Sequence, residues 1–322
     1  MSCKDNNPGP SVIDAVIGQK RAVQQLKIAL DAHFNDRSGA TEEIAFPHTL
    51  MLGPPGVGKT LLASIVAAEL GSQFHEELAQ NLLTPGHVHG VMMMLEPGSV
   101  LFLDEIHSAP PAAFVTLLKC LEERKLFLGG DRKVMELPPF TLIGATTDAW
   151  ALSGPLQQRF KLILQMEHYS TEELTALVRQ RAKRMGWTIT DDALTGIALR
   201  GRGTPRLAIR LMEAAHRHAR AEAATAITDQ HLLQMCEIEG IDQIGLDPLE
   251  RRYLYLLKHA QGPVRMNVIA SQLAVPRKTI EMIENDLIRL GLITKTEAGR
   301  TLTAAGAKHL TETVKDEQPK TV

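Results

Sequence analysis

The segment Gly53–Thr60, which reads Gly-Pro-Pro-Gly-Val-Gly-Lys-Thr, has residue types and a spacing suited to binding phosphate. In the pattern Gly-x-x-x-x-Gly-Lys-Thr the glycines let the backbone wrap a phosphate, and the lysine reaches the β- and γ-phosphates of a nucleotide. The threonine hydroxyl of such a loop ligates Mg²⁺. A glycine-rich structural turn can match the same pattern, so the flanking elements have to decide between the two interpretations.

Those flanking elements favour a phosphate site. His48–Leu52 is a short apolar run typical of a buried parallel strand, and Leu61–Leu70 has good helix formers and ends at Gly71. A strand, a glycine loop and a helix direct backbone N–H groups and the positive helix N-terminus at an anion. We therefore predict an ATP site, with Thr60 as a Mg²⁺ ligand. The residues that we expect to contact the nucleotide in this segment are Gly53, Pro54, Pro55, Gly56, Val57, Gly58, Lys59, Thr60 and Leu61.

A second motif, Val100–His107, reads Val-Leu-Phe-Leu-Asp-Glu-Ile-His. Four apolar residues followed by two carboxylates predict a buried strand that delivers acids to the carboxyl edge of a parallel sheet. We expect Asp104 to take part in Mg²⁺ coordination and Glu105 to orient and deprotonate the attacking water. An exposed acidic strand end is the alternative, and the preceding phosphate loop favours the catalytic interpretation.

Two threonines follow a third predicted strand. Pro139–Ala145 is an apolar run that ends at Thr146 and Thr147. A hydroxyl at that sheet edge would lie where a polar group can sense the γ-phosphate of a nucleotide. A strand-end cap or turn is the simpler interpretation of the same pair.

Two arginines are candidates for contacting a phosphate from outside the loop. Arg159 follows a short predicted helix, from which it would project out of its domain, although a solvated surface arginine is the alternative. Arg206 lies in the first turn of a helix that begins at Thr204 and Pro205. A cation at a helix start opposes the helix dipole, so either a nucleotide phosphate or a surface glutamate is expected to hold it there.

Two connecting segments have weaker patterns. Residues 71–98 are mixed, and Thr84-Pro85-Gly86 is predicted to be a turn. Phe127–Glu136 has apolar flanks around a Gly-Gly-Asp turn and predicts a β-hairpin.

Composition excludes several classes of protein. The 35 Lys and Arg against 37 Asp and Glu give a formal net charge of −2, so the chain is no global polycation. An apolar content of 44% over 322 residues is enough for two or three domains with real cores. The three cysteines are scattered, which indicates a reducing compartment rather than a zinc site or a disulfide framework. No apolar run approaches the length of a membrane span, so we expect a cytoplasmic protein with no membrane contact.

The last third of the chain predicts a winged helix. Helices from Tyr169 onward give way to a unit over residues 245–312, with three helices followed by two strands around Glu-Ala-Gly. Four cations cluster at the third helix start and in the wing, where DNA phosphates would lie. These predicted DNA contacts are Arg277, Lys278, Lys295 and Arg300. Many winged helices bind only protein, so the sequence leaves both kinds of partner open.

Together these motifs resemble those of AAA+ ATPases, and specifically the RuvB family, the hexameric motor of Holliday-junction branch migration. The resemblance covers roughly residues 15–312. Its most specific segments are Gly53–Thr60, Asp104–His107, Pro138–Thr147, Arg202–Arg206 and Gly262–Val264, with Gly245-Leu-Asp and Thr279-Ile-Glu in addition. It implies an α/β fold: a parallel-sheet ATPase domain over 15–167, a small helical lid domain over 168–244 and a winged-helix domain over 245–312, between tails at 1–14 and 313–322.

The resemblance also implies roles for single residues. Thr146 and Thr147 lie at the sensor 1 position, and Arg206 is at sensor 2. Arg159 is the finger that enters the neighbouring subunit's ATP site, and Ile17-Gly18-Gln19 lines the adenine pocket. An arginine supplied in trans implies a homo-oligomer, a hexameric ring. The implied activity is ATP hydrolysis with Mg²⁺, coupled to translocation of double-stranded DNA at Holliday junctions.

The sequence departs from the family at several positions. Asp148 stands where the family usually has Arg, and Gln157-Gln158 stands in place of Arg-Asp. The hairpin around Gly129-Gly130 is several residues shorter than in the family, and the wing has fewer arginines. RuvB meets RuvA at that hairpin, so the sequence leaves a RuvA-like partner open. The alternative function is that of a RuvB paralogue with the same ATPase, which remodels a protein and uses the winged helix as a protein adaptor.

Overall fold

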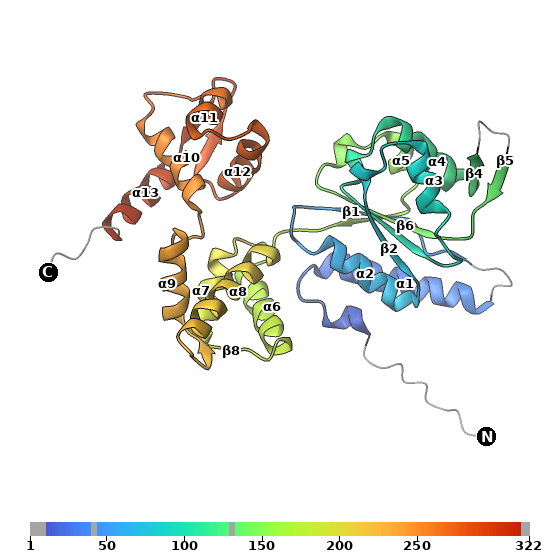
Figure 1. Cartoon of the computed structure of the whole chain (residues 1–322), viewed down its shortest axis with the longest axis horizontal. Coiled ribbons are helices and arrows are strands. Elements are labelled where there is room, and N and C mark those ends of the chain that lie inside the picture. Colours follow the sequence, from blue (N-terminus) through green and yellow to red (C-terminus); the bar gives the residue numbers. More distant parts are fainter. Residues whose placement is uncertain (1–10, 40–43, 129–132, 317–322) are drawn as a thin grey trace. The chain divides into compact units, whose positions relative to one another are not determined.

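The structure, a computed structural model, describes residues 11–39, 44–128 and 133–316 (Figure 1). It divides into two compact units. The first holds the described residues up to Leu177 together with Gly203–Arg206, and the second holds Val178–Arg202 and the described residues from Leu207 onward. The turn Gly203–Arg206 goes with the first unit because its backbone bonds there: Tyr169 N donates to Gly203 O at 2.9 Å. The three domain boundaries predicted above stay predictions.

A five-stranded parallel sheet, in the order β2-β3-β6-β1-β7, forms the centre of the first unit. The predicted parallel sheet is therefore confirmed. The strand that ends at Thr146 lies between the strand before the phosphate loop and the strand that ends at Asp104. The strands are β1 (Thr49–Leu52), β2 (Phe74–Leu78), β3 (Val100–Asp104), β6 (Thr141–Thr146) and β7 (Leu162–Gln165).

Helices cover both faces of this sheet (Figure 1). Neighbouring residues of one strand enter opposite cores: Leu101 packs into one hydrophobic cluster and Phe102 into the other. Burial on both faces explains why the strands read as continuous apolar runs in the sequence. One face carries the 3₁₀ turn η1 (Val12–Ala15), α1 (Lys20–Gly39) and α2 (Lys59–Leu70). The other carries α3 (Pro85–Met92), α4 (Pro111–Glu123) and α5 (Gly154–Gln157), and 3₁₀ turns lie at η2 (Ala79–Asn81), η3 (Ile106–Ser108) and η4 (Ala149–Ala151).

The segment Thr84-Pro85-Gly86 is not the predicted turn, because helix α3 begins there. Thr84 is its N-cap and accepts a hydrogen bond from His87 N, and Pro85 occupies the first helical position. Threonine before proline is a helix start signal that the sequence does contain. Strand β2 was also not predicted, since its polar residues at the sheet edge have no apolar run.

The predicted hairpin is present as β4 (Lys125–Leu128) and β5 (Lys133–Glu136), which pair antiparallel. The predicted Gly-Gly-Asp turn at its tip falls on residues 129–132, outside the described residues.

The second unit contains a lid and a winged helix. The lid elements are α6 (Thr171–Arg184), β8 (Thr188–Ile189), α7 (Asp191–Arg200), α8 (Pro205–Ala221), β9 (Ala226–Ile227) and α9 (Asp229–Glu239); the first turns of α6 and α8 belong to the first unit. The winged helix consists of α10 (Pro248–His259), α11 (Met266–Leu273), α12 (Arg277–Arg289), β10 (Ile293–Lys295) and β11 (Arg300–Leu302). Helix α13 (Ala304–Asp316) follows it and was not predicted; it extends into the expected C-terminal tail. Leu310 of α13 is fully buried.

Arg300 lies in a buried ion pair, so its predicted contact with DNA is wrong. Its Nε donates to Glu284 Oε1 at 2.7 Å and its Nη2 to Glu284 Oε2 at 2.9 Å. The Tyr253 hydroxyl donates to the same carboxylate at 3.0 Å. Arg300 is 8% exposed and Glu284 2%. The sequence contains the signal for this: Glu284 lies on the buried stripe of α12, beside Ile280 and Leu287.

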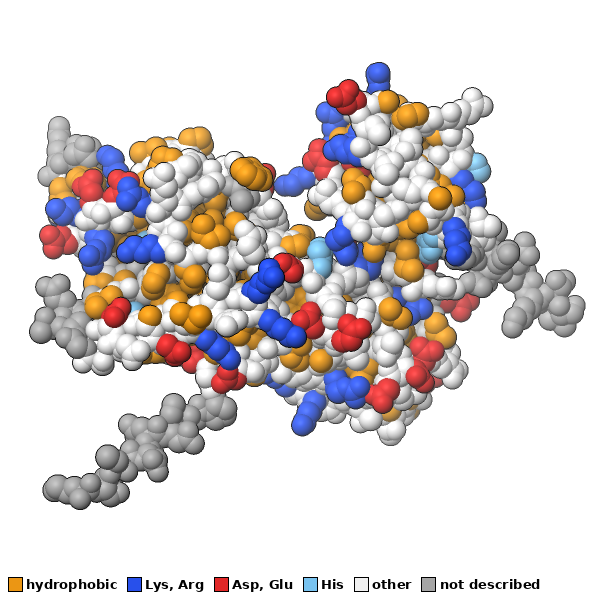
Figure 2. Space-filling model, turned by 180° about the vertical axis from the view of Figure 1, so that it is seen from behind, with side chains coloured by type: hydrophobic (Ala, Val, Ile, Leu, Met, Phe, Trp, Pro, Cys, Tyr) orange, Lys and Arg blue, Asp and Glu red, His pale blue; other side chains and the backbone are white. Residues whose placement is uncertain are grey.

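Charges of both signs share the molecular surface. On the face shown in Figure 2, lysine and arginine side chains lie among acidic ones rather than in one basic patch. Cys120 and Cys236, the cysteines within the described residues, are free and buried. No helix in the described parts of the chain is long and apolar enough to cross a membrane.

We predict that Glu284→Ala destabilises the winged helix by about 3–5 kcal/mol, because it leaves the Arg300 guanidinium buried without its carboxylate. Hydrogen exchange of the α10 and α12 amides measures the loss. The matched control is Glu281→Ala, on the exposed side of the same helix, and should change the free energy of unfolding by less than about 0.5 kcal/mol. Equal protection in the two variants would show that the ion pair does not hold this fold.

Candidate functional site

The predicted phosphate loop connects the end of β1 to the start of α2. Gly56 and Gly58 adopt left-handed backbone conformations, with φ of +76° and +101°. A Cβ added at Gly56 would lie 3.0 Å from both Arg206 Cβ and Thr204 Cγ2. Glycine is therefore required here both by the backbone conformation and by the close approach of the turn before α8.

Lys59 is buried beneath this loop, with 7% of its surface exposed. Its Nζ donates hydrogen bonds to Gly53 O at 2.8 Å and Pro54 O at 2.9 Å. Burial lowers the pKa of Lys59, and the carboxylates of Asp104 and Glu105 oppose this effect. The structure thus brings together the lysine and both acids that the sequence predicts.

Asp104 and Glu105 lie at the carboxyl end of β3. Asp104 Oδ1 accepts a hydrogen bond from Glu105 N at 2.9 Å. Glu105 has a left-handed backbone with φ of +49°. Such a conformation is uncommon for a residue with a side chain, and strained backbone of this kind concentrates at functional sites.

Thr146 is buried at the end of β6, and its backbone joins the phosphate loop. Gly53 N donates to Thr146 O at 3.2 Å. The Thr146 hydroxyl lies 2.7 Å from Nδ1 of His107 and accepts a hydrogen bond from Asp148 N at 3.0 Å. The side chain of Thr147 is exposed. Sequence reasoning included His107 in the Asp-Glu-Ile-His motif but gave it no role.

Arg206 approaches the loop through its backbone. Its N–H donates to Gly56 O at 3.3 Å, while its side chain is exposed. Its charge also contributes to lowering the pKa of Lys59. The nucleotide's γ-phosphate, if bound by Lys59, would therefore lie within the electrostatic influence of Arg206.

The segment predicted to line an adenine pocket lies against one residue that the sequence did not indicate. Ile17 is half-buried, and Gln19 beside it bonds both backbone groups of Glu167, at 2.7 Å and 3.1 Å. Tyr169 lies against this segment, because a Cβ added at Gly18 would meet its ring at 2.5 Å. Its hydroxyl also lies 3.9 Å from the Cβ position of Gly58. No motif spacing links Tyr169 to the loop, so only the fold brings it there.

Arg159 is not assembled with the other site residues. Its guanidinium forms an ion pair with Glu122 at the end of α4, and both side chains are partly exposed. Leu61, the last predicted residue of the loop segment, points outward with 62% exposure.

The residues present fit a magnesium ion. Mg²⁺ takes oxygen ligands and is usually held by one or two carboxylates together with substrate phosphates and water. Asp104 offers a carboxylate at the strand end, and Thr60 offers a hydroxyl at the start of α2. Lys59 directly precedes Thr60 and lies within the electrostatic influence of Asp104, which places both donors at one edge of the sheet.

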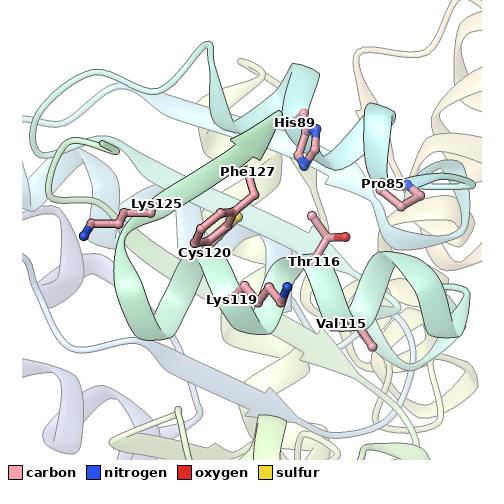
Figure 3. Close-up of a pocket in the computed structure, with 8 residues that line it drawn as sticks. All are labelled: Pro85, His89, Val115, Thr116, Lys119, Cys120, Lys125 and Phe127. Atoms are coloured by element: carbon pink, nitrogen blue, oxygen red, sulfur yellow. The ribbon is translucent and has the colours of Figure 1, made fainter. Parts of the chain in front are cut away.

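A cavity of about 180 Å³ lies apart from this site, between α3, α4 and β4 (Figure 3). Its wall combines Lys119, Lys125 and His89 with the ring of Phe127 and the sulfur of Cys120. The Lys119 ammonium lies 5.3 Å from the centre of the Phe127 ring. Burial raises the pKa of the Cys120 thiol to about 11, so this sulfur is protonated at neutral pH. None of the lining residues belongs to the predicted ATP site.

The predicted DNA-contacting cations other than Arg300 are exposed. Arg277 and Lys278 begin α12, the third helix of the winged helix, and Lys295 ends β10 in the wing. The Arg277 guanidinium bonds Asn267 of α11. Exposed cations at a helix start and in a wing are placed as phosphate-contacting groups require.

Comparison with known proteins gives matches along almost the whole chain. The Holliday junction DNA helicase RuvB P-loop domain matches residues 9–166, the RuvB AAA lid domain 169–242 and the RuvB C-terminal winged helix domain 243–311. The Holliday junction branch migration complex subunit RuvB of Synechococcus sp. (strain CC9311) is 38% identical over 317 residues, which covers 95% of this chain and 87% of that protein. The subunit of the same name from Paramagnetospirillum magneticum is 37% identical over 314 residues, covering 94% and 88%.

A solved structure agrees with these matches. The Thermotoga maritima RuvB Holliday junction branch migration motor is 35% identical, superposes with a TM-score of 0.81, and covers 94% of this chain and 97% of its own. A parallel-sheet P-loop domain, an AAA lid and a winged helix are thus found by geometry and by sequence alike. The chain belongs to the RuvB family of AAA+ ATPases.

Proposed function

We propose that this chain is a RuvB-like motor that hydrolyses ATP with Mg²⁺ and translocates double-stranded DNA at Holliday junctions, as a hexameric ring in the cytoplasm. The observation that carries the ATPase is the convergence of Lys59, Asp104 and Glu105 at one sheet edge. The names of the relatives, all branch migration subunits, support the junction as substrate. The two buried free cysteines agree with a reducing compartment.

In this proposal Lys59 leaves the two loop carbonyls and binds the β- and γ-phosphates. Glu105 orients the attacking water and takes its proton. Thr146 senses the γ-phosphate at the end of β6, and Arg206 contacts the same phosphate from the start of α8. Thr60 and Asp104 would hold Mg²⁺, which would supply positive charge against the phosphates. Ile17 and Tyr169 would enclose the adenine.

Arg159 acts in the neighbouring subunit. Its side chain pairs with Glu122 and not with the acids of its own site. We infer that it exchanges this exposed partner for the γ-phosphate of the adjacent protomer, which makes each ATP site incomplete without a second copy. Exposed ion pairs contribute little stability, so this exchange costs little.

The charged residues of the winged helix bear on what the motor moves. Arg277, Lys278 and Lys295 support contact with DNA phosphates. The burial of Arg300 leaves Lys295 as the predicted contact in the wing, and this favours a protein load as the second candidate. A RuvA-like partner at the β4–β5 hairpin remains a prediction, because the hairpin tip lies outside the described residues.

We predict that Lys59→Ala weakens ATP binding, since it removes the charged phosphate donor. Glu105→Gln should leave binding intact and lower turnover by about 10²–10⁴-fold, because the general base is lost. Titration with a fluorescent ATP analogue measures binding, and phosphate release measures turnover. Glu123→Gln, an exposed change at the end of α4, is the control and should alter neither. Retained turnover in Glu105→Gln would remove the role assigned to Glu105.

Arg159→Ala should lower turnover by about 10³–10⁵-fold without weakening ATP binding, as expected for an arginine finger. Mixing Arg159→Ala with Glu105→Gln subunits tests where it acts. Some mixed interfaces then combine an intact Glu105 with a neighbour's intact Arg159, so activity should return. If the two variants assemble together and no activity returns, Arg159 does not act in trans.

Linear duplex and four-way junction DNA should each stimulate ATP turnover at low salt, and the stimulation should fall as salt rises. Arg277→Ala and Lys278→Ala should weaken DNA binding and each reduce the salt slope by about 1. Lys258→Ala, an exposed cation on α10, is the control and should keep the slope of the parent protein. ATPase activity that no DNA alters would identify the protein-remodelling candidate instead.

A further inference from the structure

His107 lies between the predicted general base and the predicted sensor threonine. It belongs to η3, the turn that directly follows Glu105. Its Nδ1 is 2.7 Å from Thr146 Oγ1, and its Nε2 is 3.4 Å from Glu105 Oε2. One imidazole ring thus contacts both groups, each through a different nitrogen.

The Thr146 hydroxyl can donate only one hydrogen bond, and its choice of acceptor decides which nitrogen of His107 carries the proton. The hydroxyl carries a single proton and has two acceptors within reach, His107 Nδ1 at 2.7 Å and Asp148 O at 3.1 Å. If the hydroxyl donates its hydrogen bond to His107 Nδ1, the neutral ring carries its own proton on Nε2 and donates to the Glu105 carboxylate. If the hydroxyl donates to Asp148 O instead, the neutral ring donates to Thr146 through Nδ1–H, and Nε2 presents a lone pair. That lone pair repels a carboxylate, because neither atom can then donate.

We propose that His107 is a positioning residue that couples the Thr146 hydroxyl to the orientation of Glu105. This proposal rests on the proposed ATPase and adds a link between two of its groups. When the hydroxyl donates to His107 Nδ1, the neutral ring carries its proton on Nε2, and this Nε2–H holds the Glu105 carboxylate in the orientation that faces the attacking water.

The surroundings of the three residues keep this geometry in place. Thr146 is fully buried, so its hydroxyl cannot bond bulk water instead. Glu105 has a fixed left-handed backbone, held by its N–H bond to Asp104 Oδ1. The 3.4 Å contact to Glu105 is longer than an ordinary hydrogen bond. Catalytic hydrogen bonds in structures without substrate are often long and tighten on binding.

Asp148, which replaces the usual arginine of the family, supports the other side of Thr146. Its Oδ1 accepts hydrogen bonds from Trp150 N at 3.0 Å and Ala151 N at 3.3 Å. Its own backbone N and O are the remaining partners of the Thr146 hydroxyl. The side chain therefore fixes the turn whose backbone competes with His107 for the hydroxyl proton.

The test uses the full chain and steady-state ATP turnover with three replacements of His107. His107→Phe keeps the ring and removes both nitrogens, His107→Asn retains a group only near Nδ1, and His107→Gln retains a donor near Nε2. We expect kcat to fall by roughly 10- to 100-fold in His107→Phe and His107→Asn, because a displaced base loses alignment with the water. His107→Gln should recover part of this loss. KM and the affinity for ATP should stay unchanged in all three.

A double-mutant cycle with Thr146→Val separates coupling from a direct role of each residue. If Thr146 acts on Glu105 through His107, Thr146→Val should lower kcat in the parent chain and add little in the His107→Phe background. Losses that multiply would overturn the proposal, since the two residues would then act independently. An unchanged kcat in His107→Phe would overturn it as well.

Two controls keep these outcomes distinct from a failure of the ATPase itself. His87→Phe, an exposed histidine on α3, should keep the parent kcat, and thermal melting checks that each variant folds. If the parent chain hydrolyses no ATP, the proposed function fails. If the parent chain hydrolyses ATP and every His107 variant does so equally, only the role of His107 fails.

Discussion

The parallel pairing of β1, β6 and β3 is the constraint on which the ATP site depends. Parallel strands in register end at the same edge of a sheet. The residues that follow these strands therefore lie close together, even when they are far apart in the sequence. Leu52 pairs with Thr146, and Gly53 N donates to Thr146 O. The phosphate loop therefore begins at the level where β6 ends. Because β6 also pairs with β3, Asp104 and Glu105 are brought to the same edge.

Two buried cations show how their partners decide what each can bind. Lys59 bonds two backbone carbonyls, which are neutral acceptors, and burial lowers its pKa. A triphosphate offers stronger, charged acceptors, so it can displace those carbonyls. Arg300 has a bidentate bond to the buried Glu284 carboxylate, which raises its pKa. Breaking that pair for a solvated DNA phosphate would leave a carboxylate buried without compensation.

Much of the fold followed from local sequence patterns. Helix α2 ends directly before Gly71, as its sequence predicts, and β3 ends at the carboxylates. The phosphate loop was predictable because its glycines are demanded by backbone geometry, which a short motif records. The prediction for Arg300 was wrong because a charged residue in a wing is expected to be exposed as long as its buried partner is not recognised. That partner, Glu284, is recognisable only by its place on a buried helical stripe, 16 residues away.

Other parts of the site have no local signal. Tyr169 contacts Gly18 and approaches Gly58 although both lie more than 100 residues away in the sequence. The contact of His107 with Thr146 joins residues 39 positions apart. Such contacts depend on strand order, and strand order is a property of the whole domain. The motif marks the residues that are predicted to touch phosphate, while the residues packed against them are brought there by the fold.

The short segment Arg202–Arg206 contains two arginines that bond different parts of the chain. Arg206 N bonds the phosphate loop at Gly56, so the start of α8 is fixed to the nucleotide site within the first unit. Arg202, four residues earlier, bonds Glu250 of α10 at 2.8 Å, and Arg289 of α12 donates to Arg202 O at 3.0 Å within the second unit. Burial raises the pKa of Glu250, and the Arg202 guanidinium opposes this. Arg202 thus has a partner in the winged helix, while Arg206 binds the phosphate loop through its backbone. The backbone group that bonds the phosphate loop is therefore only four residues along the chain from a side chain that bonds the winged helix.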